Sequence, residues 1–423
     1  MAQGHGRVVG ASRGIYVTGV NREEANRASI TASRAELIAI IAMMAATVAF
    51  ATDAMLPAFP DISADLSPYD PNRAQLVVAS FMVGLGAGTL FAGPLCDAFG
   101  RQAVTIGGTV IIIIFATVSA LAQSLELLLL ARCLQGVGSA GPRVASMAIV
   151  RDLFRGREMA RILSFVILVF TLAPVFAPSI GWLLAQGFGW RSIFVSFAVF
   201  SVISTGWLLL RLPETLSREE RRSLRVRELV DGLLEVSSSR QVMLAIGCQS
   251  LVFAVLMSTL LSSQQVFDKV FDRGAAFPLW FALMAALAAG ASVMNAAIVV
   301  RVGMRKVVRV ALLVHSSCTG IFLLAMITGV LPASWLFPVG FLWCTSVFQL
   351  AGFALGNINA IAMEPMGHMA GLAASIITSV ATIASIAIAA PVGQAFDGTL
   401  VPLTAATFVL TALALLLVHR IEG

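Results

Sequence analysis

Long apolar runs alternate with short polar segments along most of the chain. Twelve of these runs are about as long as a helix that crosses a lipid bilayer, which takes about 20 residues. We place them near residues 35–58, 74–94, 103–123, 126–149, 159–185, 190–211, 241–265, 276–299, 307–330, 333–360, 371–396 and 399–419. The pattern therefore predicts an all-α membrane protein with twelve transmembrane helices.

A single longer connection divides these segments into six and six. Residues 212–240 are rich in charged side chains, and we expect them to form a partly helical linker along the inner membrane surface. The predicted order is a polar cytoplasmic tail (1–34), an N-terminal six-helix bundle (35–211), the linker (212–240) and a C-terminal six-helix bundle (241–423). Two bundles around a central pathway are typical of transporters.

The composition agrees with a lipid environment, because 58% of the residues are hydrophobic and 12% are charged. If the first helix runs outward, 22 of the 28 lysine and arginine residues fall on the inner side. Cytoplasmic loops carry such an excess of basic residues. We therefore predict a multi-pass protein of the cell inner membrane with both termini in the cytoplasm. The net charge of +6 then reflects topology and does not indicate a nucleic-acid partner.

Sequence signatures of catalysis and of nucleotide binding are missing. The chain has no GxxxxGK[ST] or HExxH motif, and its four histidines and five cysteines are scattered. We expect neither enzyme activity nor a bound cofactor or metal. Uphill transport would then draw on an ion gradient, such as the proton gradient, or on a partner.

Two charged residues interrupt the apolar segments. Asp53 lies in the stretch AFATDAMLPAFPDI, about 26 Å from the inner surface if Glu36 marks that surface. Arg132, in the fourth segment, lies about 21 Å from it in a bilayer core about 30 Å thick. These similar depths predict a pair across a cavity, in which Arg132 keeps Asp53 ionised and Asp53 carries the proton. The alternatives place Asp53 at the membrane interface and let Arg132 reach the outer surface.

Arg132 shares one helical face with Gln135, Ser139 and Arg143, because steps of three or four residues separate them. An arginine that faces lipid is costly, so we expect this face to line a substrate cavity. The alternative for Arg143 is that its side chain extends to the inner surface.

Polar residues and prolines also mark later segments. Segments ten and eleven offer further candidates for the cavity, although serine and threonine hydroxyls can instead bond their own helix: Gln349, Ser375, Thr378 and Thr382. The fifth segment contains residues that favour a kink or a tight interface, unless the prolines are merely tolerated in a membrane helix: Pro174, Pro178 and Gly181.

The loop after the second segment reads GPLCDAFGRQ. Gly93 and Gly100 allow a tight turn, and Asp97 with Arg101 can tie helix ends together. An ordinary charged loop is the alternative.

Together these motifs resemble the major facilitator superfamily, in particular its twelve-span drug–proton antiporters. GPLCDAFGR is similar to the family's loop motif, RCLQGVGSA to its fourth-span motif, and APVFAPSIG followed by GWRSIF to its antiporter segment. The segments TDAMLPAFPDI, VRDLF, LPETL and AMEPMGHMAGLAASI are similar to the bicyclomycin/chloramphenicol-resistance branch. The resemblance runs from about Thr52 to Ile377. It implies the major facilitator fold, alternating access, and a conformational latch at Gly93–Arg101 in which Asp97 contacts the second bundle.

We therefore expect proton-coupled efflux of small, largely apolar compounds such as antibiotics by a monomer. A proton-coupled carrier of one specific metabolite, anionic in view of the two arginines, is the first alternative. A non-transporting membrane sensor or scaffold is the second. The chain departs from the family pattern at Ala98 and Gln102, where basic residues are common, at Val300, where an aspartate would repeat, and at Ala45, where some relatives carry a second acid.

Overall fold

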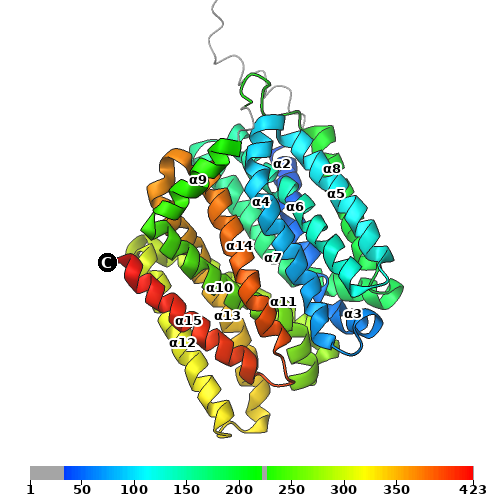
Figure 1. Cartoon of the computed structure of the whole chain (residues 1–423), viewed down its shortest axis with the longest axis vertical. Coiled ribbons are helices and arrows are strands. Elements are labelled where there is room, and N and C mark those ends of the chain that lie inside the picture. The colour runs from blue at the N-terminus through cyan, green and yellow to red at the C-terminus, as the bar shows by residue number, and fades with distance from the viewer. Residues whose placement is uncertain (1–32, 222–225, 423) are drawn as a thin grey trace, which may run out of the picture.

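The structure is a computed structural model that describes residues 33–221 and 226–422. Its regular structure within these residues is entirely helical (Figure 1). The long helices are α2 (Arg34–Asp53), α4 (Leu76–Phe99), α5 (Arg101–Leu121), α6 (Leu125–Leu153), α7 (Gly156–Phe188), α8 (Ser192–Arg211), α10 (Arg240–Gln265), α11 (Phe277–Val302), α12 (Met304–Ile327), α13 (Ala333–Met363), α14 (Ala370–Gln394) and α15 (Val401–Glu422).

Shorter helices connect the long ones: η1 (Leu56–Ala58), α3 (Phe59–Leu66), η2 (Pro71–Gln75), α9 (Val226–Ser238), η3 (Val266–Val270), η4 (Gly274–Ala276) and η5 (Glu364–Met369). Most of the predicted N-terminal tail, residues 1–32, lies outside the described residues, as do residues 222–225 of the predicted linker.

The long helices correspond in order to the twelve predicted segments. By length and apolar composition, nine helical stretches of the described residues could cross a membrane. One of these, Ala333–Gln394, contains both α13 and α14. The stretches do not include α6, which carries Arg132 and Arg143.

The first predicted segment, residues 35–58, is not one continuous helix. Helix α2 ends at Asp53, and η1 and α3 continue the chain. Pro57 explains the break, because proline has no N–H and its ring clashes with the carbonyl group four residues earlier, which here belongs to Asp53. Asp53 is therefore the last residue of α2 and not part of the interior of a longer helix.

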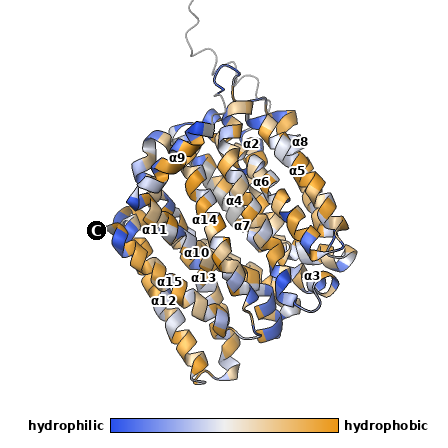
Figure 2. Cartoon of the chain, in the orientation of Figure 1, coloured by the Kyte–Doolittle hydropathy of each residue, from blue (hydrophilic) through white to orange (hydrophobic). Residues whose placement is uncertain are grey.

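The long helices form two groups in the order of the chain (Figure 1). In the first group, α6 packs on α4 and α5, and α2 packs on α7; in the second, α10 packs on α13, α14 and α15. The groups meet where α4 contacts α14 and α7 contacts α11. Apolar residues run along the helices, whereas hydrophilic ones gather near the helix ends (Figure 2).

The two ends of the helices are held by different ion pairs. We call the end with α9 and the Gly93–Arg101 loop the linker end, and the opposite end the α3 end. At the linker end, Arg211 contacts Glu36 at 2.6 Å. At the α3 end, Arg191 contacts Asp65 at 2.7 Å.

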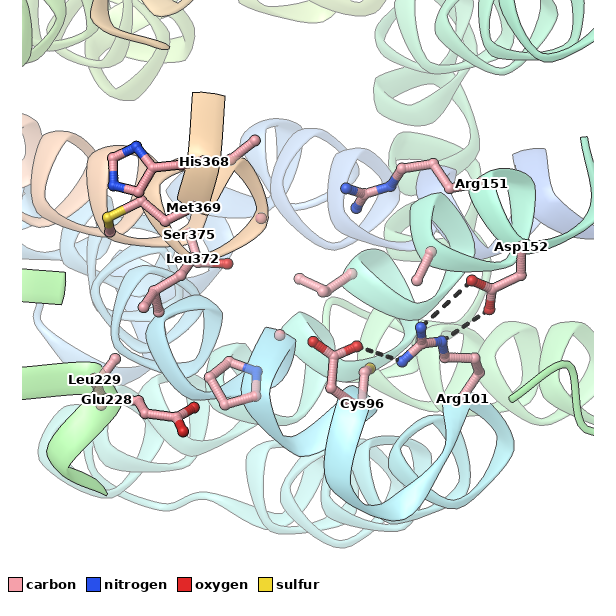
Figure 3. Close-up of a pocket in the computed structure, with 17 residues that line it drawn as sticks. Cys96, Arg101, Arg151, Asp152, Glu228, Leu229, His368, Met369, Leu372 and Ser375 are labelled. Carbon is pink, nitrogen blue, oxygen red and sulfur yellow. Dashed lines mark hydrogen bonds and ion pairs between the residues drawn. The ribbon is translucent and has the colours of Figure 1, made fainter. Parts of the chain in front are cut away.

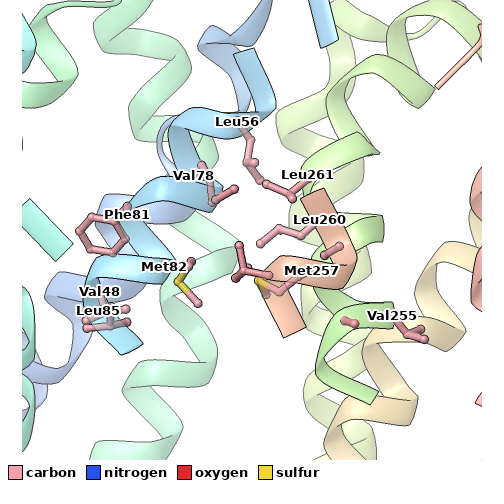
Figure 4. Close-up of a cluster of buried hydrophobic side chains, with 14 of the residues drawn as sticks. Val48, Leu56, Val78, Phe81, Met82, Leu85, Val255, Met257, Leu260 and Leu261 are labelled. Carbon is pink, nitrogen blue, oxygen red and sulfur yellow. The ribbon is translucent and has the colours of Figure 1, made fainter. Parts of the chain in front are cut away.

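An apolar cluster fills the space between the two groups toward the α3 end (Figure 4). Side chains of η1 and α4 face side chains of α10, and each is at most 7% exposed: Leu56, Val78 and Met82 on one side, Met257, Leu260 and Leu261 on the other. This cluster leaves little room for water between the groups at that level.

Candidate functional site

Asp53 is buried where α2 ends. It is 5% exposed, and the hydroxyl of Thr52 lies 3.1 Å from its carboxylate. Helix α7 crosses at this point so closely that a methyl group at Gly181 would overlap the carbonyl oxygen of Ala54. The same helix carries Pro174 and Pro178, which together with Gly181 form the segment predicted to be a kink or a tight interface; we call it the hinge segment. The hinge segment therefore packs against the end of α2 that holds the carboxylate.

Arg132 is 1% exposed and has a full set of partners. Its guanidinium donates hydrogen bonds to the carbonyl oxygens of Ala51 (2.8 Å) and Val77 (3.2 Å) and to the side-chain oxygen of Gln135 (2.6 Å). It also lies over two aromatic rings, those of Phe81 (4.4 Å to the centroid) and Phe194 (5.7 Å). These contacts join α6 to α2, α4 and α8.

The predicted ion pair between Asp53 and Arg132 is not formed in this conformation of the described residues. The physical reason lies in the end of α2. The last carbonyl groups of a helix lack partners in a following turn, and they form the negative end of the helix dipole. Arg132 binds one of these groups, that of Ala51, two residues before Asp53. It therefore caps the helix that carries the carboxylate.

Gln135 and Ser139 are buried within the helix packing, at 0% and 1% exposure, and do not face open space in this conformation. Ser139 donates to the carbonyl oxygen of Gln135 at 2.8 Å. A methyl group at Gly136 would overlap the carbonyl oxygen of Phe81, so α4 and α6 are in close contact here. The prediction that these two side chains line a cavity does not hold for this conformation.

The predicted latch forms a charge cluster at the linker end (Figure 3). Arg101 contacts Asp97 at 2.7 Å and Asp152 at 3.0 Å. Gly100 has a φ of 101°, and a side chain there would meet the carboxylate of Glu214. Among the described hydrogen bonds and ion pairs, Asp97 contacts Arg101 and no residue of the second group of helices. The contact implied by the family resemblance is therefore absent from this conformation.

Two carboxylates of this cluster had no predicted role. Asp152 binds Arg101, and Glu214 accepts hydrogen bonds from the backbone N–H groups of Arg101 (2.9 Å) and Gln102 (3.1 Å). Glu214 thereby caps the start of α5. Asp152 lies in VRDLF and Glu214 in LPETL, two segments that carry the family resemblance. Their position beside predicted helix ends could have indicated a role in capping or ion pairing.

A cavity of about 560 Å³ opens between the two groups of helices at the linker end. Figure 3 shows Arg101, Arg151 and Asp152 on one side of it and Glu228 and His368 on the other. A second cavity, of about 250 Å³, adjoins it. The two share lining residues from α6 and α14, namely Val144, Arg151, Gly371 and Ser375. Together they form a vestibule that leads in from the linker end.

The smaller cavity holds three of the predicted cavity residues, Arg143, Ser375 and Thr378. Thr382 is 7% exposed and packs beside Gly86, where α4 meets α14. Gln349 lines a separate cavity of about 470 Å³ between α11, α12 and α13. Sequence spacing placed these side chains on polar faces, but it gave no information on which face the neighbouring helices would cover.

Gly93 lies at the contact between the two groups, where an added methyl group would stand 3.1 Å from the Ser375 hydroxyl. It acts there as a spacer between α4 and α14.

The α3 end is closed by side-chain amides. Asn72 donates to the carbonyl oxygen of Gln394 at 3.1 Å, and Gln394 donates to that of Asn72 at 2.8 Å. Gln75 and Gln265 pair at 2.5 Å, and Gln265 also donates to Asn72 at 3.1 Å. These contacts join η2 of the first group to α10 and α14 of the second.

The sequence profile of the Major Facilitator Superfamily matches residues 40–389. A bicyclomycin resistance protein homolog of Haemophilus influenzae is 28% identical over 333 residues, which is 78% of this chain and 82% of that protein. The uncharacterized MFS-type transporter YdgK of Bacillus subtilis is 28% identical over 89% of this chain and 92% of its own length. The multidrug resistance protein MdtL of Escherichia coli O81 is 31% identical over 57% of this chain and 59% of its own length.

Solved structures share the fold at low identity. A crystal structure of a D-xylose–proton symporter matches with a TM-score of 0.72 at 14% identity, over 90% of this chain and 96% of that one. The human organic anion transporter MFSD10 matches with a TM-score of 0.64 at 17% identity, over 91% of this chain and 99% of that one. Because the family profile covers well over half of a chain folded in this way, the chain belongs to the Major Facilitator Superfamily.

Proposed function

We propose that this chain exports small, largely apolar compounds such as antibiotics in exchange for protons. The names of its relatives support this proposal, because they include a bicyclomycin resistance homolog and a multidrug resistance protein. The fold also agrees with alternating access, in which two bundles move around a site between them.

The vestibule at the linker end is the observation that carries the proposal. It is open at the linker end, lies between two groups of helices, and is separated from the α3 end by an apolar cluster and an amide network. A transporter that alternates between two openings has such an arrangement when one opening is closed. This conformation would receive a compound from the linker side.

We assign the proton to Asp53. A carboxylate buried without a basic partner is costly while it is charged. Its protonation therefore affects the free energy of the packing between the end of α2 and the hinge segment of α7. In this proposal Arg132 acts through the position of that helix end, because it binds the carbonyl group of Ala51.

The distribution of basic residues supports one orientation in the membrane. We propose that the linker end faces the cytoplasm of a bacterial cell, that both termini lie there, and that the protein works as a monomer in the inner membrane. Reporter fusions after Ser217 and after Gln123 test this orientation. The first should report a cytoplasmic location and the second an external one, and the reverse result would overturn the assignment.

A drug-susceptibility panel in a pump-deficient host tests the function. Expression should raise the inhibitory concentration of several apolar antibiotics, and everted vesicles should accumulate the same compounds only under a proton gradient. No change in susceptibility, together with gradient-driven transport of a single metabolite, would favour the specific carrier. No transport of any compound would favour the sensor or scaffold.

A further inference from the structure

The smaller cavity has an unusual electrostatic character. Arg143 and Arg151 line it, and the remaining lining residues are apolar or carry hydroxyl groups, with no carboxylate among them. In the larger cavity beside it, Asp97, Asp152 and Glu228 accompany the basic residues. The inner part of the vestibule is therefore positive, whereas its outer part is mixed.

Arg143 has no partner for its guanidinium among the described residues. The one hydrogen bond at this residue uses its backbone carbonyl oxygen, which accepts from Ser146. The two buried arginines of the described helices differ: Arg132 makes three hydrogen bonds, and Arg101 contacts two carboxylates. A partly buried cation without a counter-charge is costly, and a bound anion would offset this cost.

The rest of the cavity fits an apolar body. Ala45 of α2, Met147 of α6 and Val166 of α7 supply apolar walls, and Ser375 and Thr378 of α14 add hydroxyl groups on the opposite side. The methionine side chain is flexible and can adapt to different shapes. A guanidinium binds a carboxylate through two parallel hydrogen bonds, which fixes the orientation of the ligand as well as its charge.

We infer that the exported compounds include small amphipathic carboxylates, whose acidic group binds Arg143 while their apolar part lies against Ala45, Met147 and Val166. This inference rests on the proposed function, since it names a substrate class for the same vestibule. It also assigns Arg143 as the residue that selects for charge. Arg151, nearer the open end, guides anions inward.

Matched pairs of ligands test the inference. Purified protein in lipid nanodiscs is titrated with aromatic carboxylates of increasing size, beginning with 2-naphthoate, and with the corresponding neutral amides. Wild-type protein should bind at least one acid about tenfold more tightly than its amide, because hydrogen bonds between charged groups are the strong ones. Arg143→Gln should bring this ratio to about one, and Arg143→Lys should retain part of the preference because it keeps the charge.

Arg161→Gln is the matched control, because it removes an exposed cation of α7 that does not line this cavity. It should leave the ratio unchanged, and the melting temperature of each variant shows whether it is folded. Equal affinity of wild type for every acid and its amide would overturn the inference, as would a preference that survives in Arg143→Gln. Displacement of naphthoate by millimolar chloride or phosphate would assign Arg143 to simple anions and would likewise overturn it.

Transport separates this inference from the proposed function. If neutral antibiotics are exported by both wild type and Arg143→Gln, and only wild type exports the carboxylates, both stand. If neutral compounds are exported but carboxylates are not, the inference fails and the proposed function survives. If nothing is exported while naphthoate still binds through Arg143, the proposed function fails together with the export of carboxylates, and only the assignment of Arg143 as the anion-binding residue stands.

Discussion

Asp53 is enclosed in this conformation, and among the described residues its hydrogen-bond partner is the neighbouring Thr52. Asp53→Asn keeps the size of the side chain but cannot carry a proton on and off. We expect this variant to insert normally, to lose efflux driven by a pH gradient, and to retain exchange of labelled for unlabelled compound in proteoliposomes. Asp61→Asn, at an exposed carboxylate of α3, is the control and should transport normally. Full gradient-driven efflux by Asp53→Asn would refute the assignment.

Arg132 contributes to the stability of the helix packing as well as to the proposed proton coupling. Arg132→Ala removes the donor that Arg132 supplies to the carbonyl group of Ala51 and to the side-chain oxygen of Gln135, and each buried unsatisfied group costs about 1–3 kcal/mol. We expect a clear fall in the melting temperature in detergent, a smaller fall for Arg132→Lys, and none for Arg151→Ala, whose exposed side chain bonds its own helix. An unchanged melting temperature for Arg132→Ala would show that the helix cap contributes little.

The sequence singled out both residues, but the ion pair predicted between them is not formed in this conformation, because Arg132 binds the carbonyl group of Ala51. Their depth could be calculated from residue spacing, and the cost of a charge in lipid indicated that both are functional or paired. The partner of Arg132 depends on the end of α2, and that end depends on Pro57, which the apolar pattern had absorbed into one long segment. A one-dimensional hydropathy pattern does not show where a proline ends a helix.

At the scale of helices, α7 and the end of α2 are in such close contact at Gly181 that there is no space for a larger side chain. Gly181→Ala would place a methyl group against the carbonyl oxygen of Ala54, and overpacking costs about 1–3 kcal/mol. We expect lower transport and a lower melting temperature. Gly187→Ala, six residues further along α7, has open space around it and should behave as wild type. Equal activity of the two variants would show that α7 moves away without penalty.

The charge cluster of the latch divides into a buried and an exposed part. The side chain of Arg101 is 7% exposed, whereas that of Asp97 is 52% exposed and faces the larger cavity. We expect Asp97→Asn to change the balance of conformations, measured as modification of Thr378→Cys by a membrane-impermeant thiol reagent from each side, without loss of stability. Asp152→Asn removes the more buried partner of Arg101 and should lower the melting temperature. The opposite pattern would show that Asp152 is the latch.

Helix order and the charged loops could be predicted from the sequence, because hydropathy and turn residues act locally. The exposure of faces could not. The stripe on α6 contains Gln135, Ser139 and Arg143 at regular spacing, yet the packing covers the first two and leaves Arg143 beside a cavity. That outcome depends on the close approach of α4 at Gly136, which is a property of the folded pair of helices.

At the scale of the whole molecule, neutral side-chain amides and apolar residues close the space between the two groups of helices at the α3 end. Asn72→Ala removes three hydrogen bonds that its side chain makes with Gln265, Gln394 and Phe396. We expect the α3 end to open more often, so that Thr378→Cys reacts faster with an impermeant reagent added from that side. Gln123→Ala, at an exposed loop of the same end, should leave the rate unchanged. A rate for Asn72→Ala equal to that of wild type would assign the closure to the apolar cluster alone.

At this scale the prediction was most complete. The twelve segments, their order and the superfamily are confirmed. They could be predicted because each depends on long, repeated features, so that an error at one helix end does not change the result. The placement of the cavity relative to the two ends was not predictable, since the same sequence must pack in more than one way during transport.

The two ends of the pathway also differ in their response to dissolved ions. The linker end holds charged groups at the surface of a water-filled vestibule, and salt weakens attraction between exposed charges beyond about 10 Å at 0.1 M. At the α3 end the two groups of helices are joined by neutral amides and apolar contacts, which such screening hardly affects, and the ion pair of Arg191 with Asp65 lies within the first group. We therefore expect ionic strength on the linker side to act on the charge cluster of Arg101, Asp97 and Asp152. Salt added on the linker side would then weaken that cluster while leaving the opposite closure as it was.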